Sequence, residues 1–105
     1  MARTTIEELK KNRLATMTAD QRAVFDETYE AGRLALNVGE KVRGAREVAG
    51  LSREELAARM GTSQAAVARL EAGDVRARLT TLQRVATAMN LTVSIEFAVV
   101  VGGRR

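Results

Sequence analysis

Apolar and small side chains recur at steps of three and four residues between Val24 and Ala49, which is the period of one face of an α-helix. The preceding Thr18-Ala-Asp-Gln21 has the capping-box pattern, in which two side chains accept hydrogen bonds from free backbone amides at a helix start. We therefore expect one long helix after Thr18. Three glycines interrupt the stripe, each costing about 1 kcal/mol relative to alanine, so the sequence allows a break or bend near Gly39.

The pattern between residues 40 and 90 differs, because its apolar runs are short and are separated by glycine or asparagine. It predicts helices over about 40–48, 53–60, 64–71 and 79–89. Ser52 and Ser63 are suited to cap the second and third helices, and Asn90 is suited to the left-handed conformation that ends the fourth. Apolar side chains from this segment should form one small core: Leu51, Leu56, Ala57, Met60, Val67, Leu70, Leu82, Val85, Ala86 and Met89.

After Asn90 the apolar period changes to two, which predicts a β-strand whose apolar side carries Leu91, Val93, Ile95, Phe97 and Val99. A lone strand leaves backbone N–H and C=O groups unpaired on both edges. We therefore infer that two chains pair here across a two-fold axis and form a homodimer. The alternatives are a frayed tail and a strand lying against its own domain.

The predicted fold is thus mainly α, with one dimerising strand. Residues 1–38 form an N-terminal helical arm, residues 39–90 a compact domain of four to five helices, residues 91–101 the strand and residues 102–105 a flexible basic tail. Within the arm, Thr5-Ile-Glu-Glu8 is a further capping box and predicts a short helix near residues 6–13.

Composition argues against an enzyme. The 105 residues include no His and no Cys, which removes imidazole catalysis, thiolate nucleophiles and Cys/His zinc sites. No nucleotide-binding glycine motif is present, so we expect no cofactor, no metal and no small-molecule substrate. The longest apolar run is far below the roughly 20 residues of a membrane-spanning helix, and no signal-peptide core precedes Glu7. We expect a cytoplasmic protein without a membrane partner.

Charge is distributed unevenly along the chain. Residues 1–38 carry six basic and six acidic side chains, whereas residues 39–90 carry nine basic and six acidic ones, a net charge of +3. Residues 91–105 add one further positive charge. An anionic partner should therefore dock on the middle segment, and nucleic acid is the obvious candidate. Scattered arginines that merely solvate helix faces are the alternative.

The segment Leu51–Gly73 predicts the geometry that DNA-reading proteins use. The connection Gly61-Thr-Ser63 is too short for its flanking helices to lie antiparallel, so they should cross steeply as a helix-turn-helix, with Ala57 and Val67 inside the crossing. Small side chains let the second helix enter a major groove, where Gln and Arg distinguish adenine and guanine. Its outward face carries Gln64, Ala65, Ala68 and Arg69, with Ser63 at its N-terminus.

These residues resemble the Cro/repressor-type helix-turn-helix family, also called the XRE family, with the pattern L-[ST]-x-x-E-L-A-x-x-x-G-[VT]-S-x-x-x-[VI]-x-x-[LIW]-E-x-G. The resemblance implies binding of a double-stranded DNA operator. It also implies that Arg46 pairs with Glu71, and that Arg43 and Arg53 lie near phosphates. Gln64-Ala65-Ala66 offers fewer polar base-readers than many relatives, so specificity would rest partly on Arg69 and DNA shape.

The arrangement as a whole resembles HigA-type antitoxins, on Met1–Leu9, the long helix, Glu71–Val75 and Thr80–Phe97. This resemblance implies an antitoxin that represses its own operator and neutralises a cognate RelE/HigB-like ribonuclease toxin. The charge-neutral arm is then the candidate toxin-binding region, through Val24, Phe25, Asp26, Tyr29 and Glu30. The alternatives are a stand-alone XRE-family repressor, and an inhibitory protein with only weak DNA contact. For the arm helix, the alternative to toxin binding is that it packs only on its own domain.

Overall fold

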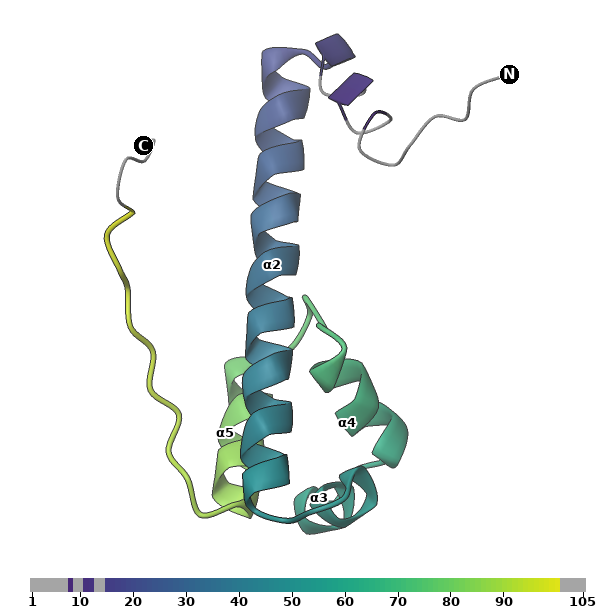
Figure 1. Ribbon diagram of the computed structural model, residues 1–105, viewed down its shortest axis with the longest axis vertical. Coiled ribbons are helices and arrows are strands. Elements are labelled where there is room, and N and C mark those ends of the chain that lie inside the picture. The colour runs from purple at the N-terminus through teal and green to yellow at the C-terminus, as the bar shows by residue number, and fades with distance from the viewer. Residues whose placement is uncertain (1–7, 9–10, 13–14, 101–105) are drawn as a thin grey trace.

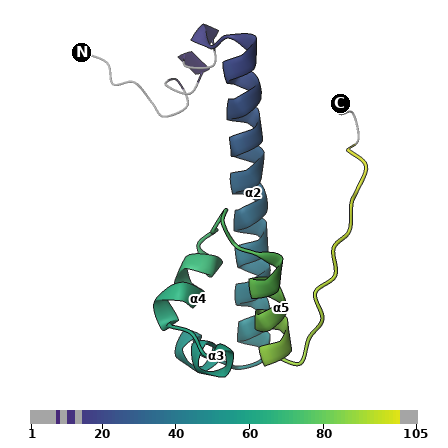
Figure 2. The ribbon, with the colours of Figure 1, turned by 180° about the vertical axis from the view of Figure 1, so that it is seen from behind.

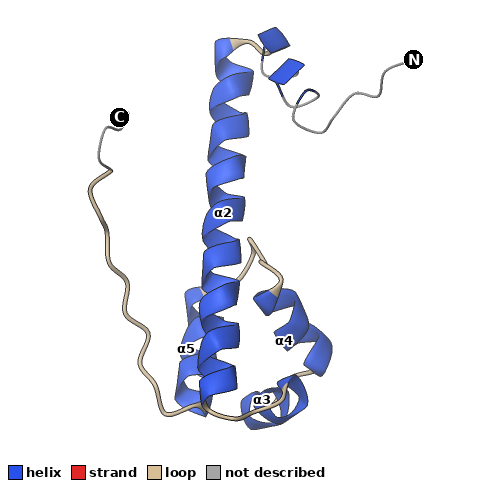
Figure 3. Cartoon of the chain, in the orientation of Figure 1, coloured by secondary structure: helices blue, strands red, loops and turns tan. Residues whose placement is uncertain are grey.

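The computed structural model describes residues 8, 11–12 and 15–100. Four helices occupy this part of the chain: α2 (Ala19–Val48), α3 (Arg53–Met60), α4 (Gln64–Glu71) and α5 (Leu79–Ala88). The described residues contain helices and connecting segments but no strand (Figure 3). The mainly α-helical fold is therefore confirmed. The short helix expected near residues 6–13 falls mostly outside the described residues.

Helix α2 is much longer than the others and sets the shape of the molecule. Helices α3, α4 and α5 gather around its C-terminal half, while its N-terminal half projects beyond them (Figures 1 and 2). Buried residues occur only in the C-terminal half, at Ala35, Gly39, Val42 and Arg46. The sequence pattern continues through both halves, but only one half is covered by the domain.

The helix starts follow from local hydrogen bonding, as the sequence predicts. At the start of α2, the Gln21 amide donates to Thr18 Oγ1 at 3.1 Å and the Thr18 amide donates to Gln21 Oε1 at 3.0 Å. The equivalent bonds between Ser52 and Glu55 begin α3. Two donors are satisfied at each start, which contributes about 1 kcal/mol relative to an alanine cap.

No break or bend marks α2 at Gly39, where the sequence allows one: the helix continues without interruption to Val48. A Cβ atom built on Gly39 would lie 2.5 Å from the carbonyl oxygen of Glu71 and 2.7 Å from that of Leu70. The missing side chain therefore serves the close approach of α2 to the end of α4, rather than a change in helix direction. Periodicity along one helix cannot reveal a contact with another.

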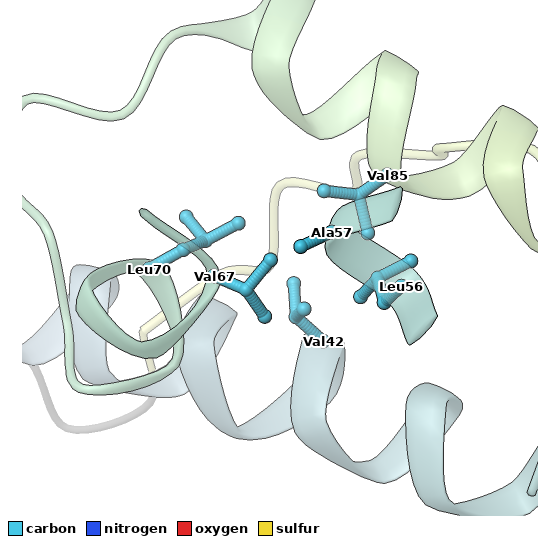
Figure 4. Packing of buried hydrophobic residues seen from close by; sticks show 6 residues of the cluster. All are labelled: Val42, Leu56, Ala57, Val67, Leu70 and Val85. Carbon is cyan, nitrogen blue, oxygen red and sulfur yellow. The ribbon is translucent and has the colours of Figure 1, made fainter. Parts of the chain in front are cut away.

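The core lies where the four helices meet (Figure 4). Its most deeply buried large side chains are Leu56 of α3 and Val67 of α4, each at most 1% exposed. Burying each such side chain contributes about 1.5–3 kcal/mol. The cluster consists of Val42, Leu56, Ala57, Val67, Leu70 and Val85, with Met60, Leu82 and Met89 half-buried against it. The predicted core is thus confirmed, with Val42 of the long helix added to it.

The segment 91–100 does not form the predicted strand in the single chain. It leaves the end of α5, where the Leu91 amide donates to the Ala86 carbonyl at 2.8 Å, and all ten residues are exposed. It runs from the base of the domain toward the end of the molecule where α2 begins (Figure 1). A β-strand needs a neighbour to complete its hydrogen-bonded ladder, and no described segment of the same chain supplies one. Pairing with a second chain stays a prediction.

Candidate nucleic-acid interface

Helices α3 and α4 are joined by the tight connection Gly61–Ser63. Gly61 ends α3 with a φ of 68°, a left-handed conformation that glycine adopts without a Cβ clash. The Thr62 amide donates back to the Ala57 carbonyl at 2.9 Å, and Ser63 Oγ accepts from the Ala66 amide at 3.1 Å to begin α4. Ala57 is 3% exposed, so its small side chain lies between the packed helices. The two helices are therefore held at a fixed angle by their caps and their shared core.

Helix α4 has one face in the core and one face in solvent. Val67, Leu70 and Glu71 are buried, whereas Gln64, Ala65 and Arg69 are exposed and Ala68 is half-buried. The exposed face therefore combines small side chains with one amide and one guanidinium. Both polar groups are of the kind that makes paired hydrogen bonds to base edges.

A buried ion pair fixes the C-terminal end of α4 against α2. Arg46 Nε donates to Glu71 Oε2 at 2.6 Å, and Arg46 Nη2 donates to Glu71 Oε1 at 3.1 Å. The third guanidinium nitrogen, Nη1, donates to the Leu51 carbonyl at 2.9 Å. The structure thus brings together the two residues that the family resemblance pairs. The bidentate contact gives the end of α4 a defined position and orientation.

Arg53, at the start of α3, also contacts this carboxylate. Its Nε donates to Glu71 Oε1 at 3.0 Å, while its side chain remains 43% exposed. Burial opposes ionisation of the Glu71 carboxyl, but hydrogen bonds from Arg46 and Arg53 outweigh it and hold the pKa of Glu71 below its ordinary value. The same carboxylate raises the pKa of Arg46. The cluster therefore holds two positive charges and one negative charge. Sequence reasoning placed Arg53 near phosphate and missed its contact with Glu71, because no local pattern reports it.

The arginines of the domain not described so far fall into three groups. Arg84 Nη2 donates to the Met60 carbonyl at 2.6 Å, and Arg59 Nη1 donates to the Ala88 carbonyl at 3.3 Å, so these two join α3 to α5. Arg43 is exposed and donates to Glu47 at 3.3 Å along α2. Two further exposed arginines, Arg76 and Arg78, lie on the connection between α4 and α5. Sequence reasoning counted them in the net charge but did not single them out as candidates.

The five candidate toxin-binding residues lie on the projecting half of α2. Val24 is 64% exposed and Tyr29 is 47% exposed, Phe25 and Asp26 are half-buried, and Glu30 is exposed beside Arg33. The rings of Phe25 and Tyr29 stack with centroids 6.4 Å apart. A shallow hollow along this half is lined by Met17, Asp20, Gln21, Val24, Phe25 and Thr28, together with Thr16. Apolar and acidic groups therefore occur side by side outside the domain.

The four candidate dimer residues are exposed in the single chain. Val93 is 39% exposed, Ile95 63%, Val99 91% and Phe97 97%. The exposure is greatest toward the end of the segment, farthest from α5. From Leu91 to Phe97 the segment borders a groove of about 680 Å³, whose other walls come from α2, α5 and the connection before α5.

Comparison with known proteins agrees with this geometry. A family model described as helix-turn-helix matches residues 42–95, just over half of the chain. The match begins in the C-terminal half of α2, spans α3 to α5 and ends in the exposed segment. No curated protein matches the chain. Within the described residues, no helix is both long enough and apolar enough to cross a membrane.

Proposed function

The chain belongs to the helix-turn-helix family, as a DNA-binding regulator of the XRE type, and from that premise we propose that it is an antitoxin that represses its own operator as a homodimer. Three surfaces carry this proposal. The exposed face of α4 reads DNA, the projecting half of α2 binds a toxin, and the segment after α5 joins two chains. The observation that carries the DNA-binding part is the exposed polar face of α4, presented by two capped and mutually packed helices.

DNA reading rests on Gln64 and Arg69, because their side chains are exposed on α4 beside Ala65. With small residues between them, the helix can enter the major groove, where a bidentate contact discriminates a base by about 1–3 kcal/mol. Arg43 on α2 and Arg53 at the start of α3 are exposed and would contact phosphates, which position the protein without reading sequence. Two chains related by a two-fold axis would place two such helices about 34 Å apart on a near-palindromic operator.

Toxin binding is assigned to the projecting half of α2 for two reasons. Its exposed apolar side chains, Val24 and Tyr29, are outside the domain that the family model covers. Acidic Asp26 and Glu30 lie on the same half of the helix. A ribonuclease binds RNA through basic groups, so an acidic and apolar helix is complementary to such a surface. The resemblance to HigA-type antitoxins supports the same assignment.

Footprinting on the chain's own promoter tests the DNA-binding part. We expect two protected half-sites. Arg69→Ala should relax base preference at one position in each half-site, at a cost of about 1–3 kcal/mol. Arg53→Ala should weaken binding to all sequences and reduce the slope of binding against salt by about one. Protection of one isolated half-site by a monomer, or a change in sequence preference caused only by Arg53→Ala, would contradict these roles.

A pair of neighbouring substitutions tests toxin binding. Val24→Asp places a charge in the exposed apolar stripe, while Ala23→Asp places the same charge on the adjacent, also exposed, position. We expect Val24→Asp to lose rescue of cells that express the toxin encoded next to this chain, and Ala23→Asp to retain it. Operator binding should be unchanged in both. The absence of a toxin gene next to this chain would favour a stand-alone repressor, and rescue retained by Val24→Asp would contradict toxin binding through this stripe.

A further inference from the structure

The segment 91–100 presents a pattern that a second copy of the chain would complete. Its odd-numbered positions from Leu91 to Val99 are all apolar, and all of them are exposed. Asn90, with a φ of 59°, marks the end of the helical part of the chain and the start of this segment. The segment makes no backbone pairing with the rest of the described chain beyond Leu91. A strand with the same alternation can complete such a segment, and a second copy of the chain supplies one.

The alternation restricts the register of such a pair. In an antiparallel pair, residues directly opposite each other place their side chains on the same face of the sheet. A two-fold axis perpendicular to the sheet also keeps the apolar side of both chains on one face. Opposite residues must then both be odd or both be even. The two-fold axis therefore passes between the two copies of a single residue, which lie directly opposite each other.

The charge of Glu96 and the length of the segment determine which residue lies at the two-fold axis. An axis at Glu96 would place two carboxylates directly opposite each other, which is destabilising. An axis at Ser94 would place Val99 opposite Met89, which precedes the segment and C-caps α5. Among positions within the described segment 91–100, axes at Ile95 and Glu96 pair the most residues, and only the axis at Ile95 avoids opposed carboxylates. It pairs every residue from 91 to 99, with Phe97 opposite Val93 and Val99 opposite Leu91.

We infer that two copies pair through residues 91–99 with the two-fold axis at Ile95, so that Phe97 of each copy covers the mouth of the other copy's groove. This inference rests on the proposed homodimer and adds its register. Val93 is the least exposed large apolar residue of the segment and lines the groove beside Leu34 and Val38 of α2. Phe97 borders the groove of its own chain but is 97% exposed there, and it would lie next to Val93 of the other copy. The most exposed aromatic ring thereby gains an apolar site.

Spin labels on the polar side of the strand test the register. The chain has no cysteine, so Thr92→Cys and Ala98→Cys each give one label per chain. With the axis at Ile95, both labelled positions are six residues from their symmetry mates, which is about 20 Å along the strand at about 3.4 Å per residue. We therefore expect equal distances in the two variants. An axis one residue away would give about 14 Å for one variant and about 27 Å for the other.

Tryptophan fluorescence tests the site of Phe97, because the chain has no tryptophan. Phe97→Trp should emit as a solvent-exposed indole at concentrations where light scattering finds a monomer, and at shorter wavelength where it finds a dimer. Val100→Trp is the control and should emit as an exposed indole in both. A dimer with unequal label distances, or one in which the indole of the Phe97→Trp variant stays exposed, would overturn the inference and leave the homodimer intact. A chain that stays monomeric at all concentrations would overturn both.

Discussion

The two halves of α2 belong to one uninterrupted helix but have very different surroundings. The C-terminal half is held by α4 through Gly39, Val42 and Arg46, all of them buried. The N-terminal half has the same three- and four-residue spacing of apolar side chains, and none of them is buried. Helical periodicity therefore identifies a face that is suited to packing, without saying what packs there. In our account, the domain covers one half and a toxin covers the other.

The largest expected difference in stability between the two halves of α2 comes from replacing two arginines that form ion pairs. Arg46→Ala leaves the Glu71 carboxylate buried with only Arg53 as a partner, and breaking a buried pair costs about 3–5 kcal/mol. Arg33→Ala removes an exposed contact with Glu30 at 3.4 Å, worth about 0–1 kcal/mol. Urea unfolding of both variants measures the contrast. Equal losses of stability would mean that the two halves are not differently packed.

The next largest contrast concerns two glycines of α2, whose replacement by alanine should change the stability in opposite directions. Gly39→Ala forces a Cβ atom against the Glu71 carbonyl, and such overpacking costs about 1–3 kcal/mol. Gly32→Ala meets no atom within 4 Å, so it should stabilise the helix by about 0.5–1 kcal/mol. Thermal unfolding should therefore shift down for the first variant and up for the second. A stabilising Gly39→Ala would contradict the close approach of α2 to α4.

Lowering the pH should weaken the packing of the covered half of α2, because this half is held by Glu71 of α4. Because the pKa of Glu71 is lowered in the folded chain, its ionised form stabilises the fold above the unfolded pKa. That stabilisation is lost as the pH falls through the lowered value. Glu71→Gln should flatten this part of the stability profile, because it removes the carboxyl whose pKa is lowered. Parallel profiles for the wild type and Glu71→Gln, measured by denaturant unfolding across acidic pH, would refute this role.

The smallest expected effect on stability comes from truncating the exposed apolar stripe on the projecting half of α2. Val24→Ala removes an exposed side chain and should change the free energy of unfolding by no more than about 0.5 kcal/mol. Val42→Ala truncates a side chain that is 8% exposed in the core and should cost more, about 1–3 kcal/mol. Chemical denaturation distinguishes them. A large loss for Val24→Ala would show that this half packs on its own domain.

Features encoded in adjacent residues were predictable from the sequence. The capping boxes at Thr18 and Ser52, the left-handed Asn90 and the convergence of apolar positions on one core depend on local pattern, and the structure contains all of them. The packing of α4 against α3 follows from the short connection Gly61–Ser63 between them. The exposed candidates Gln64, Ala65 and Arg69 on α4 could also be identified from the sequence. Once the apolar face of a short helix is assigned to the core, the opposite face must be exposed.

Features that depend on distant residues were not predictable in this way. No sequence pattern reports that Gly39 approaches the end of α4, and its effect on helix propensity suggested a bend instead. The contact of Arg53 with Glu71 joins residues 18 positions apart, so no helical spacing reports it. A strand after Asn90 would depend on a second chain, which the sequence pattern implies and a single chain does not contain.

Hydrogen exchange along α2, with and without a duplex of the promoter, tests most directly whether the two halves serve different partners. In the free chain, amides of residues 35–48 should exchange much more slowly than those of residues 22–34, because only the former half is packed. The duplex should slow exchange in α4 and at the start of α3 and leave residues 22–34 unchanged. Equal protection of both halves in the free chain, or protection of residues 22–34 by DNA, would contradict the account.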